Sequence, residues 1–261
     1  MRLVVDIGNS RMKSAIDEGG GTLRPLETFA WRETFLDAAL ERVWLEALGN
    51  RYPESIHVSN VAGNRLLPNL SAWCCSHWQT RPVPVHSERS FEGLVNGYEE
   101  PSTFGVDRWA AMIGARGSYS GALCIVDSGT ATTVDVVHAD GRHAGGAILP
   151  GIYTMRRSLG KYTAALFAAD GEISPFSDNT ASGIAGGTGY ASVGAIERLV
   201  REAERLAGPL TTIVTGGESA ILESLMERAV CRDPLLVLRG VSAIADARSD
   251  GGAATAAARC D

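Results

Sequence analysis

Two stretches of the sequence combine an apolar run with an aspartate, a glycine and small polar residues. The first spans residues 3–10 and reads LVVDIGNS, and the second spans residues 124–133 and reads CIVDSGTATT. A second strand-like run follows each stretch, so each predicts a β-hairpin whose glycine lets the backbone approach a ligand. Backbone N–H groups and hydroxyls in such a turn bind phosphate, and the aspartate can hold a cation. Two copies predict a phosphate held in a cleft between similar domains.

Asp6 and Asp127 occupy the same place in the two stretches, which makes them candidates for handling phosphate or Mg²⁺. A Mg²⁺ ion is usually held by one or two carboxylates and several waters. An aspartate here can also cap its own turn, and this alternative stays open for each residue taken alone. The repetition favours the functional interpretation. Lys13 lies in the strand after the first turn, where it faces either solvent or a ligand.

A catalytic carboxylate is predicted at Asp107, within Gly105-Val106-Asp107-Arg108 at the start of an apolar helix. A kinase that acts on an alcohol needs a carboxylate to orient the hydroxyl and take its proton. Arg108 offers a fork of donors for a substrate carboxylate or phosphate. The alternative is an aspartate that only caps the helix, beside a surface arginine.

Other catalytic motifs are missing from the sequence. It has no G-x-x-x-x-G-K-[ST] loop, no dinucleotide fingerprint and no G-x-S-x-G nucleophile elbow. Gly216-Gly217 follows a predicted strand at 212–215, and we interpret the pair as a flat surface for an adenosine. The paired hairpins therefore remain as the predicted phosphate site.

The predicted elements follow the order βββαβα twice, which indicates an α/β fold made by internal duplication. We expect domains at 1–118 and 119–261, an irregular polar loop at 87–104, helices at 188–206 and 240–248, and a strand at 235–238. Each domain contributes one of the two hairpins.

Composition narrows the class of protein. The 261 residues carry a formal net charge of −6, which argues against nucleic-acid binding, and no stretch is apolar enough to cross a membrane. The N-terminus lacks the apolar region of a signal peptide, and the five cysteines show no metal-ligand spacing. These features predict a reduced, cytoplasmic protein. Apolar surface on the second-half helices predicts a homodimer.

Five motifs together resemble those of type III pantothenate kinases. They are Asp6-x-Gly8-Asn9-Ser10-x-x-Lys13, Gly105-Val106-Asp107-Arg108, Asp127-Ser128-Gly129-Thr130-Ala131-Thr132-Thr133-x-Asp135, Gly145-Gly146-x-Ile148-x-Pro150-Gly151 and Thr215-Gly216-Gly217. Proteins described as Bvg accessory factors carry similar sequences. The resemblance implies the duplicated actin-like, ribonuclease H-like fold of the acetate and sugar kinase, Hsc70 and actin superfamily.

The resemblance also implies ATP-dependent phosphorylation of pantothenate to 4′-phosphopantothenate, the first step of coenzyme A synthesis. Asp107 would be the proton acceptor, and Asp127 would hold a monovalent cation, K⁺ or NH₄⁺. The implied ATP contacts are Asp6, Ile7, Gly8, Asn9, Ser10, Arg11, Met12, Lys13 and Thr130. The implied pantothenate contacts are Tyr98, Gly105, Val106, Asp107, Arg108 and Thr180, with a dimer interface where the Gly105–Arg108 and Thr180 regions meet. Ser10 stands where many family members have threonine.

Two alternatives to a pantothenate kinase remain open on the sequence. One is a non-catalytic regulator that uses an actin-like fold to bind a nucleotide or a protein partner. The other is a sugar or carboxylate kinase of the same superfamily. The presence of Asp6, Asp107 and Asp127 favours an enzyme over the regulator.

Overall fold

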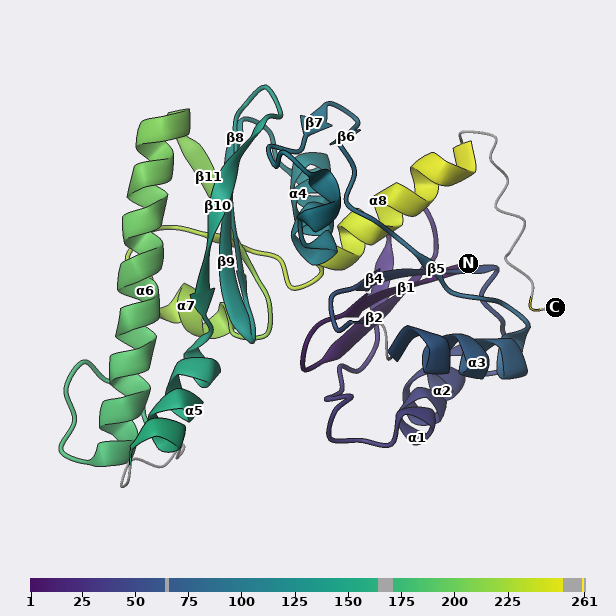
Figure 1. Cartoon of the computed structure of the whole chain (residues 1–261), viewed down its shortest axis with the longest axis horizontal. Coiled ribbons are helices and arrows are strands. Elements are labelled where there is room, and N and C mark those ends of the chain that lie inside the picture. The colour runs from purple at the N-terminus through teal and green to yellow at the C-terminus, as the bar shows by residue number, and fades with distance from the viewer. Residues whose placement is uncertain (64–65, 164–170, 251–259, 261) are drawn as a thin grey trace. The chain divides into compact units, whose positions relative to one another are not determined.

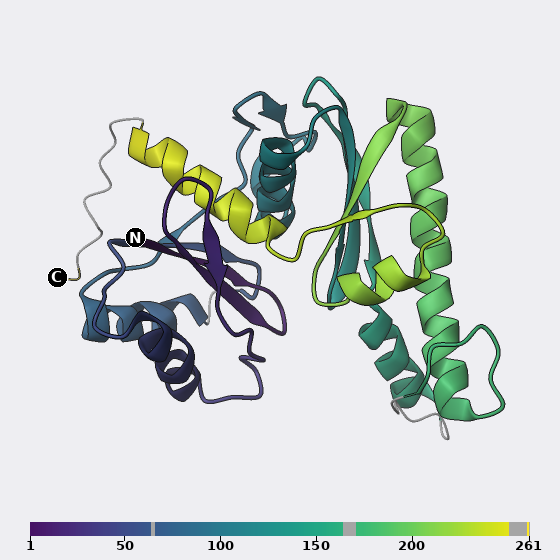
Figure 2. The same ribbon diagram turned by 180° about the vertical axis from the view of Figure 1, so that it is seen from behind.

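The computed structural model describes residues 1–63, 66–163, 171–250 and 260. The chain forms two compact units, which can be followed in Figures 1 and 2. The first unit comprises 1–91, 98–118 and 235 onward, and the second comprises 92–97 and 119–234. This division differs from the expected domains at 1–118 and 119–261, because the C-terminal helix packs with the first unit.

The first unit is built on a five-stranded sheet with β1 at its centre. β1 pairs antiparallel with β2 and parallel with β4, as a hairpin followed by a helical crossover requires. In spatial order the strands are β3 (Leu23–Pro25), β2 (Met12–Asp17), β1 (Arg2–Ile7), β4 (Ser55–Asn60) and β5 (Val83–Pro84). β5 lies at the edge of the sheet, where its proline, which cannot donate to a ladder, is tolerated.

Helices on one face of this sheet enclose the core of the first unit (Figure 1). They are α1 (Leu36–Leu40), the π-helical turn η1 (Glu41–Leu45), α2 (Glu46–Leu48) and α3 (Leu66–Trp78). Trp44 is fully buried, stacks on Trp78 and donates a hydrogen bond from Nε1 to Ser14 Oγ at 2.9 Å. The indole N–H is thereby satisfied, and the large ring fills the space between the helices and β2.

Two further helices of the first unit pack tightly on each other, α4 (Val106–Ser118) and α8 (Leu236–Asp250). Gly114 and Gly240 allow the close approach, because a Cβ on either residue would overlap with backbone of the other helix. The predicted strand at 235–238 is wrong, since residues 236–238 form the first turn of α8. All three side chains of that turn are buried, so the turn has the continuous apolar character expected of a buried strand.

A buried polar cluster ties α8 to the sheet of the first unit. Arg2 donates to Asp17 Oδ2 from Nη2 at 2.7 Å, and Ser242 Oγ on α8 donates to the same oxygen at 2.7 Å. His57 on β4 is 2% exposed, and its Nδ1 has no hydrogen-bond partner among the described residues. Burial, together with the Arg2 and Arg248 cations, lowers the pKa of His57 to about 4, against the opposing effect of Asp17 and Asp246.

We expect this histidine to make the first unit acid-sensitive. Unfolded His57 takes up a proton below about pH 6.5, whereas the folded residue stays neutral down to about pH 4. The free energy of unfolding therefore falls as pH drops through this window, by about 2 kcal/mol at pH 5. Urea unfolding at pH 7.5 and pH 5 measures the fall, and His57→Gln should remove about this amount of it. An equal fall in that variant would assign the sensitivity to other groups.

The second unit repeats the topology of the first, with β8 at the centre of its five-stranded sheet. In spatial order its strands are β10 (His143–Pro150), β9 (Ala131–Val137), β8 (Ala122–Ser128), β11 (Leu210–Thr215) and β12 (Cys231–Arg232). Again the central strand pairs antiparallel with the next strand in the chain and parallel with a later one. The matching order confirms the predicted duplication.

Helices α5 (Ile152–Tyr162), α6 (Thr180–Ala207) and α7 (Ser219–Leu225) complete the second unit, with α6 lying along the sheet (Figures 1 and 2). α6 begins eight residues before the predicted start at 188, because Asn179 caps it by accepting from Ser182 N at 3.0 Å. The loop predicted at 87–104 contains short strands β6 (Ser90–Phe91) and β7 (Leu94–Val95) and the 3₁₀ turn η2 (Pro101–Thr103). No helix in the described ranges has the length and hydropathy to cross a membrane.

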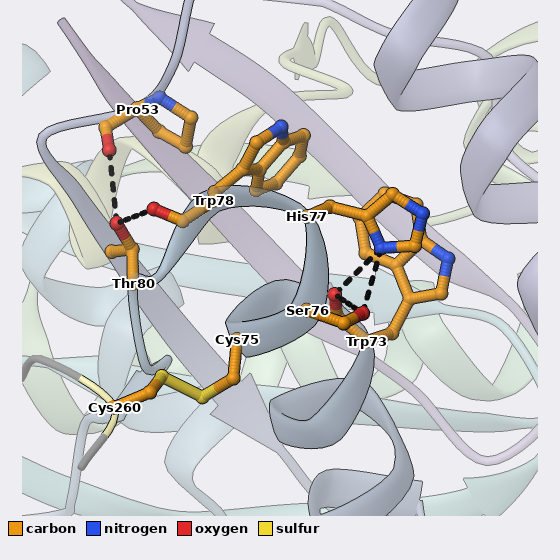
Figure 3. Close-up of a disulfide and its surroundings, with 8 residues drawn as sticks. All are labelled: Pro53, Trp73, Cys75, Ser76, His77, Trp78, Thr80 and Cys260. Carbon is orange, nitrogen blue, oxygen red and sulfur yellow. Dashed lines mark hydrogen bonds between the residues drawn. A yellow bond between two sulfur atoms is a disulfide. The ribbon is translucent and has the colours of Figure 1, made fainter.

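The cysteines differ in part from the expectation. Cys74 is buried on α3, and burial raises the pKa of its thiol to about 12. Cys75 forms a disulfide with Cys260, which Figure 3 shows beside the end of α3. The expectation that all five thiols are reduced is therefore wrong for this pair, while Cys74, Cys124 and Cys231 are free.

Candidate active site

The first hairpin places Asp6 among polar neighbours at the end of the central strand. Asp6 lies directly opposite Lys13 on β2 and beside Ser59 on β4. Ser59 Oγ donates to Asp6 Oδ1 at 3.2 Å, and both residues are buried. Directly opposed residues share one face of a sheet, so Asp6, Lys13 and Ser59 lie on the same face at the end of β1.

The turn of this hairpin is held by a hydrogen bond within it and by two donors from outside it. Gly8 N donates to Arg11 O at 3.0 Å, Trp31 Nε1 donates to Gly8 O at 2.8 Å, and Arg32 Nε donates to Asn9 O at 2.5 Å. With its carbonyls held in this way, the turn keeps one conformation. The sequence analysis did not identify Trp31 and Arg32 as residues that support this turn. Their only signal in the sequence is an isolated aromatic residue followed by a basic one.

The predicted ATP contacts 6–13 differ in exposure. Asn9, Ser10 and Arg11 are exposed, and Gly8 and Lys13 are partly exposed. Ile7 and Met12 are fully buried in the core of the first unit. The apolar side chains of these two residues therefore support the hairpin from below, and ligand contact by them is limited to the backbone.

The second hairpin has the same polar residue at the same place, with a shorter turn. Asp127 lies opposite Thr133 on β9 and beside Thr215 on β11, the position that corresponds to Ser59 in the first unit. Gly129 N donates to Ala131 O at 3.0 Å and closes the turn. The Thr215 hydroxyl is buried and has no hydrogen-bond partner within the described part of the chain. An oxygen ligand is thus available next to Asp127.

Glycines let neighbouring loops close on this second hairpin. Gly216 has φ +94°, and a Cβ there would overlap with Ser128 O and Asp127 Oδ1. A Cβ on Gly151 would overlap with Gly129 O, and Gly151 N donates to Thr130 O at 3.1 Å. The segments predicted to hold phosphate and adenosine are therefore in direct contact with each other in the second unit.

Asp107 is the second residue of α4, so its carboxylate lies in the first turn of the helix. Its Oδ1 accepts a hydrogen bond from Arg108 N at 2.8 Å. The residue is partly exposed, while the helix that follows is buried from Arg108 to Ala115. Gly105 leaves little spare room, because a Cβ there would stand 2.7 Å from Asp107 Oδ1. A rigid helix end thus presents a carboxylate at the protein surface.

Arg108 and Tyr98, ten residues apart in the chain, come together in the first unit. Arg108 Nη1 donates to Tyr98 OH at 3.1 Å, and the guanidinium lies 4.5 Å from the centre of the Phe104 ring. Tyr98 and Phe104 pack edge to face with ring centres 4.7 Å apart. Arg89 donates to the Tyr98 and Glu99 carbonyls. Phe104 and Arg89 were missed in the sequence, where nothing marked them beyond their place in the irregular loop.

Thr180 belongs to the second unit, where it is the exposed first residue of α6.

Within the residues that the structure describes, no three histidine, cysteine, aspartate or glutamate side chains form a metal-binding cluster.

The sequence is similar to one enzyme family over most of its length. A family model described as type III pantothenate kinase matches residues 2–202. A type III pantothenate kinase of Nitrosococcus oceani is 35% identical over 255 residues, covering 94% of each chain. One from Azoarcus sp. (strain BH72) is 37% identical over 254 residues, covering 95% of this chain and 91% of that one.

Solved structures with the same fold are more distant in sequence. A putative Baf family transcriptional activator from Campylobacter jejuni aligns with a TM-score of 0.57 and 22% identity, covering 95% of this chain and 99% of that one. A putative 2-dehydro-3-deoxygalactonokinase from Sinorhizobium meliloti aligns with a TM-score of 0.51 and 14% identity, covering 97% and 100%. These likenesses confirm the predicted duplicated actin-like α/β fold.

Proposed function

The chain belongs to the type III pantothenate kinase family, and we propose that it transfers the terminal phosphoryl group of ATP to pantothenate with Asp107 as proton acceptor. The family's reaction is ATP-dependent phosphorylation of pantothenate to 4′-phosphopantothenate, which begins coenzyme A synthesis. The observation that carries the proposed roles is a buried arginine directly beside a partly exposed carboxylate. The Arg108 guanidinium lies over the Phe104 ring and near the Tyr98 ring, while Asp107 remains at the surface of α4.

These residue types match the two ends of pantothenate. Its primary hydroxyl needs a carboxylate to orient it and take its proton, which is the role of Asp107. Its own carboxylate needs donors, which Arg108 supplies in a fixed orientation. Tyr98, Gly105, Val106 and Thr180 are assigned as the remaining pantothenate contacts. Arg108→Lys should raise KM for pantothenate while KM for ATP stays the same, because a lysine keeps the charge but loses the stacked fork.

ATP is assigned to residues 6–13 and to Thr130. The turn at Gly8 offers backbone N–H groups, and Lys13 on the same hairpin supplies a cation for the phosphates. Mg²⁺ bound with ATP would neutralise phosphate charge, and Asp6 is the carboxylate available for its waters.

Asp6→Asn should therefore increase the Mg²⁺ concentration needed for half-maximal activity. An unchanged Mg²⁺ requirement would remove Asp6 from this role.

A monovalent cation, K⁺ or NH₄⁺, is assigned to Asp127. Support comes from the Thr215 hydroxyl beside it, which is buried, has no hydrogen-bond partner among the residues that the structure describes and gives a second oxygen ligand. Replacing K⁺ by Na⁺ in the assay should lower activity in the native chain. Asp127→Asn should remove this difference between the two ions, and activity that does not depend on the ion would contradict the assignment.

A substrate panel tests the function itself. The purified chain is incubated with ATP, Mg²⁺, K⁺ and either pantothenate, acetate or a hexose, and the products are identified by mass spectrometry. We expect a phosphorylated product with pantothenate only. Phosphorylation of acetate or a hexose would favour a different kinase of the superfamily, and ATP binding without any product would favour the non-catalytic regulator.

We also propose a homodimer located in the cytoplasm. Large apolar side chains are exposed on the second unit, which supports association: Ile148, Tyr153, Tyr162, Phe176, Tyr190 and Leu206. Light scattering at micromolar protein should give twice the mass of one chain, and a monomer would contradict the dimer.

The Cys75–Cys260 disulfide is unusual for a cytoplasmic protein. Fractionation of the source cells should recover the enzyme in the cytoplasm. Recovery in another fraction would overturn this location.

A further inference from the structure

One carboxylate in the second unit, that of Glu218, connects segments that are far apart in the sequence. Its Oε2 accepts hydrogen bonds from Ser128 Oγ and from Ile152 N, both at 3.0 Å. Its Oε1 accepts from Tyr153 N at 2.9 Å. The backbone N–H of Glu218 also donates to Ser128 O at 3.0 Å. Glu218 thus joins the end of β8 to the start of α5 and to the turn before α7.

These segments carry residues of the proposed nucleotide site. Ser128 is preceded by Asp127 and followed by the turn that holds Thr130. The start of α5 contacts the same turn, because Thr154 Oγ1 donates to Thr130 O at 2.6 Å. The Gly216 turn stands directly before Glu218 and abuts Asp127. The side chain of Glu218 is therefore bonded to residues that adjoin the proposed cation and phosphate contacts of the second unit, and Glu218 follows the proposed adenosine turn in the chain.

The negative charge of Glu218 contributes to these contacts, as does the length of its side chain. A carboxylate at the N-terminus of an eleven-residue helix is favourable, because unpaired N–H groups and the helix dipole attract negative charge there. Ser128 Oγ also lies 3.0 Å from Thr132 Oγ1, which extends the network into β9. Three donors converge on the carboxylate. If an amide N–H₂ group replaced either of its oxygens, two hydrogen-bond donors would face each other with no acceptor between them.

From these contacts we infer that Glu218 is a positioning residue for nucleotide binding: it holds Asp127, Thr130 and the Gly216 turn in the arrangement that ATP requires. This inference rests on the proposed role of residues 127–130 at the nucleotide. Glu218 acts through the hairpin and the α5 terminus. The proposed pantothenate contacts Tyr98 and Arg108 lie in the other unit.

Glu218→Gln tests the inference, because glutamine keeps the shape of the side chain and removes one acceptor. We expect KM for ATP to rise about tenfold, equivalent to about 1.4 kcal/mol, while KM for pantothenate stays within about twofold. ADP binding measured by calorimetry without pantothenate should weaken by the same factor. Ser128→Ala removes a single donor and should produce a smaller shift in the same direction. Glu223→Gln is the matched control on α7, where the exposed carboxylate pairs with Arg232 at the surface.

The outcomes separate a positioning role from a merely structural one. A native KM for ATP and native ADP affinity in the folded Glu218→Gln variant would overturn the inference. So would an equal loss for both substrates together with a lowered Tm, because a general weakening of the fold does not select the nucleotide. If the native chain fails to phosphorylate pantothenate, the proposed function fails, and the ADP measurement still tests Glu218.

Discussion

Asp107→Asn is expected to phosphorylate pantothenate about a thousandfold more slowly than the native chain, with little change in either KM. Asparagine fills the same space and can still accept the hydrogen bond from Arg108 N, but it cannot take a proton from the substrate hydroxyl. Removal of a general base typically costs about 10²- to 10⁴-fold in rate. Steady-state assays coupled to ADP release measure kcat and both KM values.

The matched control for this variant is Asp37→Asn. Asp37 is also the second residue of a helix and is exposed, so the substitution removes the same favourable charge from a helix N-terminus. We expect native kcat for Asp37→Asn. A comparable slowing in both variants would show that helix stability, rather than proton transfer, explains the result at Asp107. A native kcat for Asp107→Asn would remove Asp107 from the mechanism.

Gly216→Ala is expected to lower kcat/KM for ATP at least about a hundredfold, equivalent to about 3 kcal/mol. Alanine is strained at φ +94°, and its Cβ would overlap with Ser128 O and Asp127 Oδ1. The turn must therefore move away from the second hairpin, which displaces the proposed adenosine surface from the proposed cation ligand. Kinetics at varied ATP, together with circular dichroism to check folding, measure the effect.

Gly208→Ala separates backbone strain from steric overlap. Gly208 follows α6 with φ +77°, and a Cβ there would meet no atom within 4 Å. The variant should lose about 1 kcal/mol of stability and keep native kinetics. If Gly216→Ala behaves in the same way, the close contact between the glycine turn and Asp127 does not control nucleotide use.

The central strands and their hairpins were predictable because a local signal specifies them. An apolar run, an acidic residue, a glycine and a second apolar run define each hairpin within about fifteen residues, and the signal occurs twice. The register then follows from the turn, which sets Asp6 opposite Lys13 and Asp127 opposite Thr133. These sites needed no knowledge of distant contacts.

Helix boundaries near glycines were harder to predict, as α6 illustrates. Gly186 and Gly189 lie within the helix because backbone or side chains from other segments approach them closely. A Cβ on Gly186 would overlap with Ser174 O. The glycines weaken the helical signal in the sequence, although the helix already begins at Thr180 with the cap from Asn179. The extent of this helix therefore depends on tertiary packing, which local helix propensity does not reflect.

Long-range contacts left no signal in the sequence. Cys75 and Cys260 are separated by 185 residues, and nothing in their spacing indicates a disulfide. Glu218 follows a predicted glycine turn, yet its hydrogen bonds reach 66 residues back to Ile152 and 90 back to Ser128. Phe104 likewise becomes informative only when the guanidinium of Arg108 is seen over its ring. Each of these features depends on the folded chain.

A crystal structure with a non-hydrolysable ATP analogue and pantothenate would test the proposed mechanism most directly. We predict that the primary hydroxyl of pantothenate lies about 2.6–3.2 Å from a carboxylate oxygen of Asp107, with Arg108 at the pantothenate carboxylate. Thr130 and the Gly8 turn should contact the phosphates. A pantothenate hydroxyl bound by another residue, with Asp107 remote from both ligands, would contradict the account.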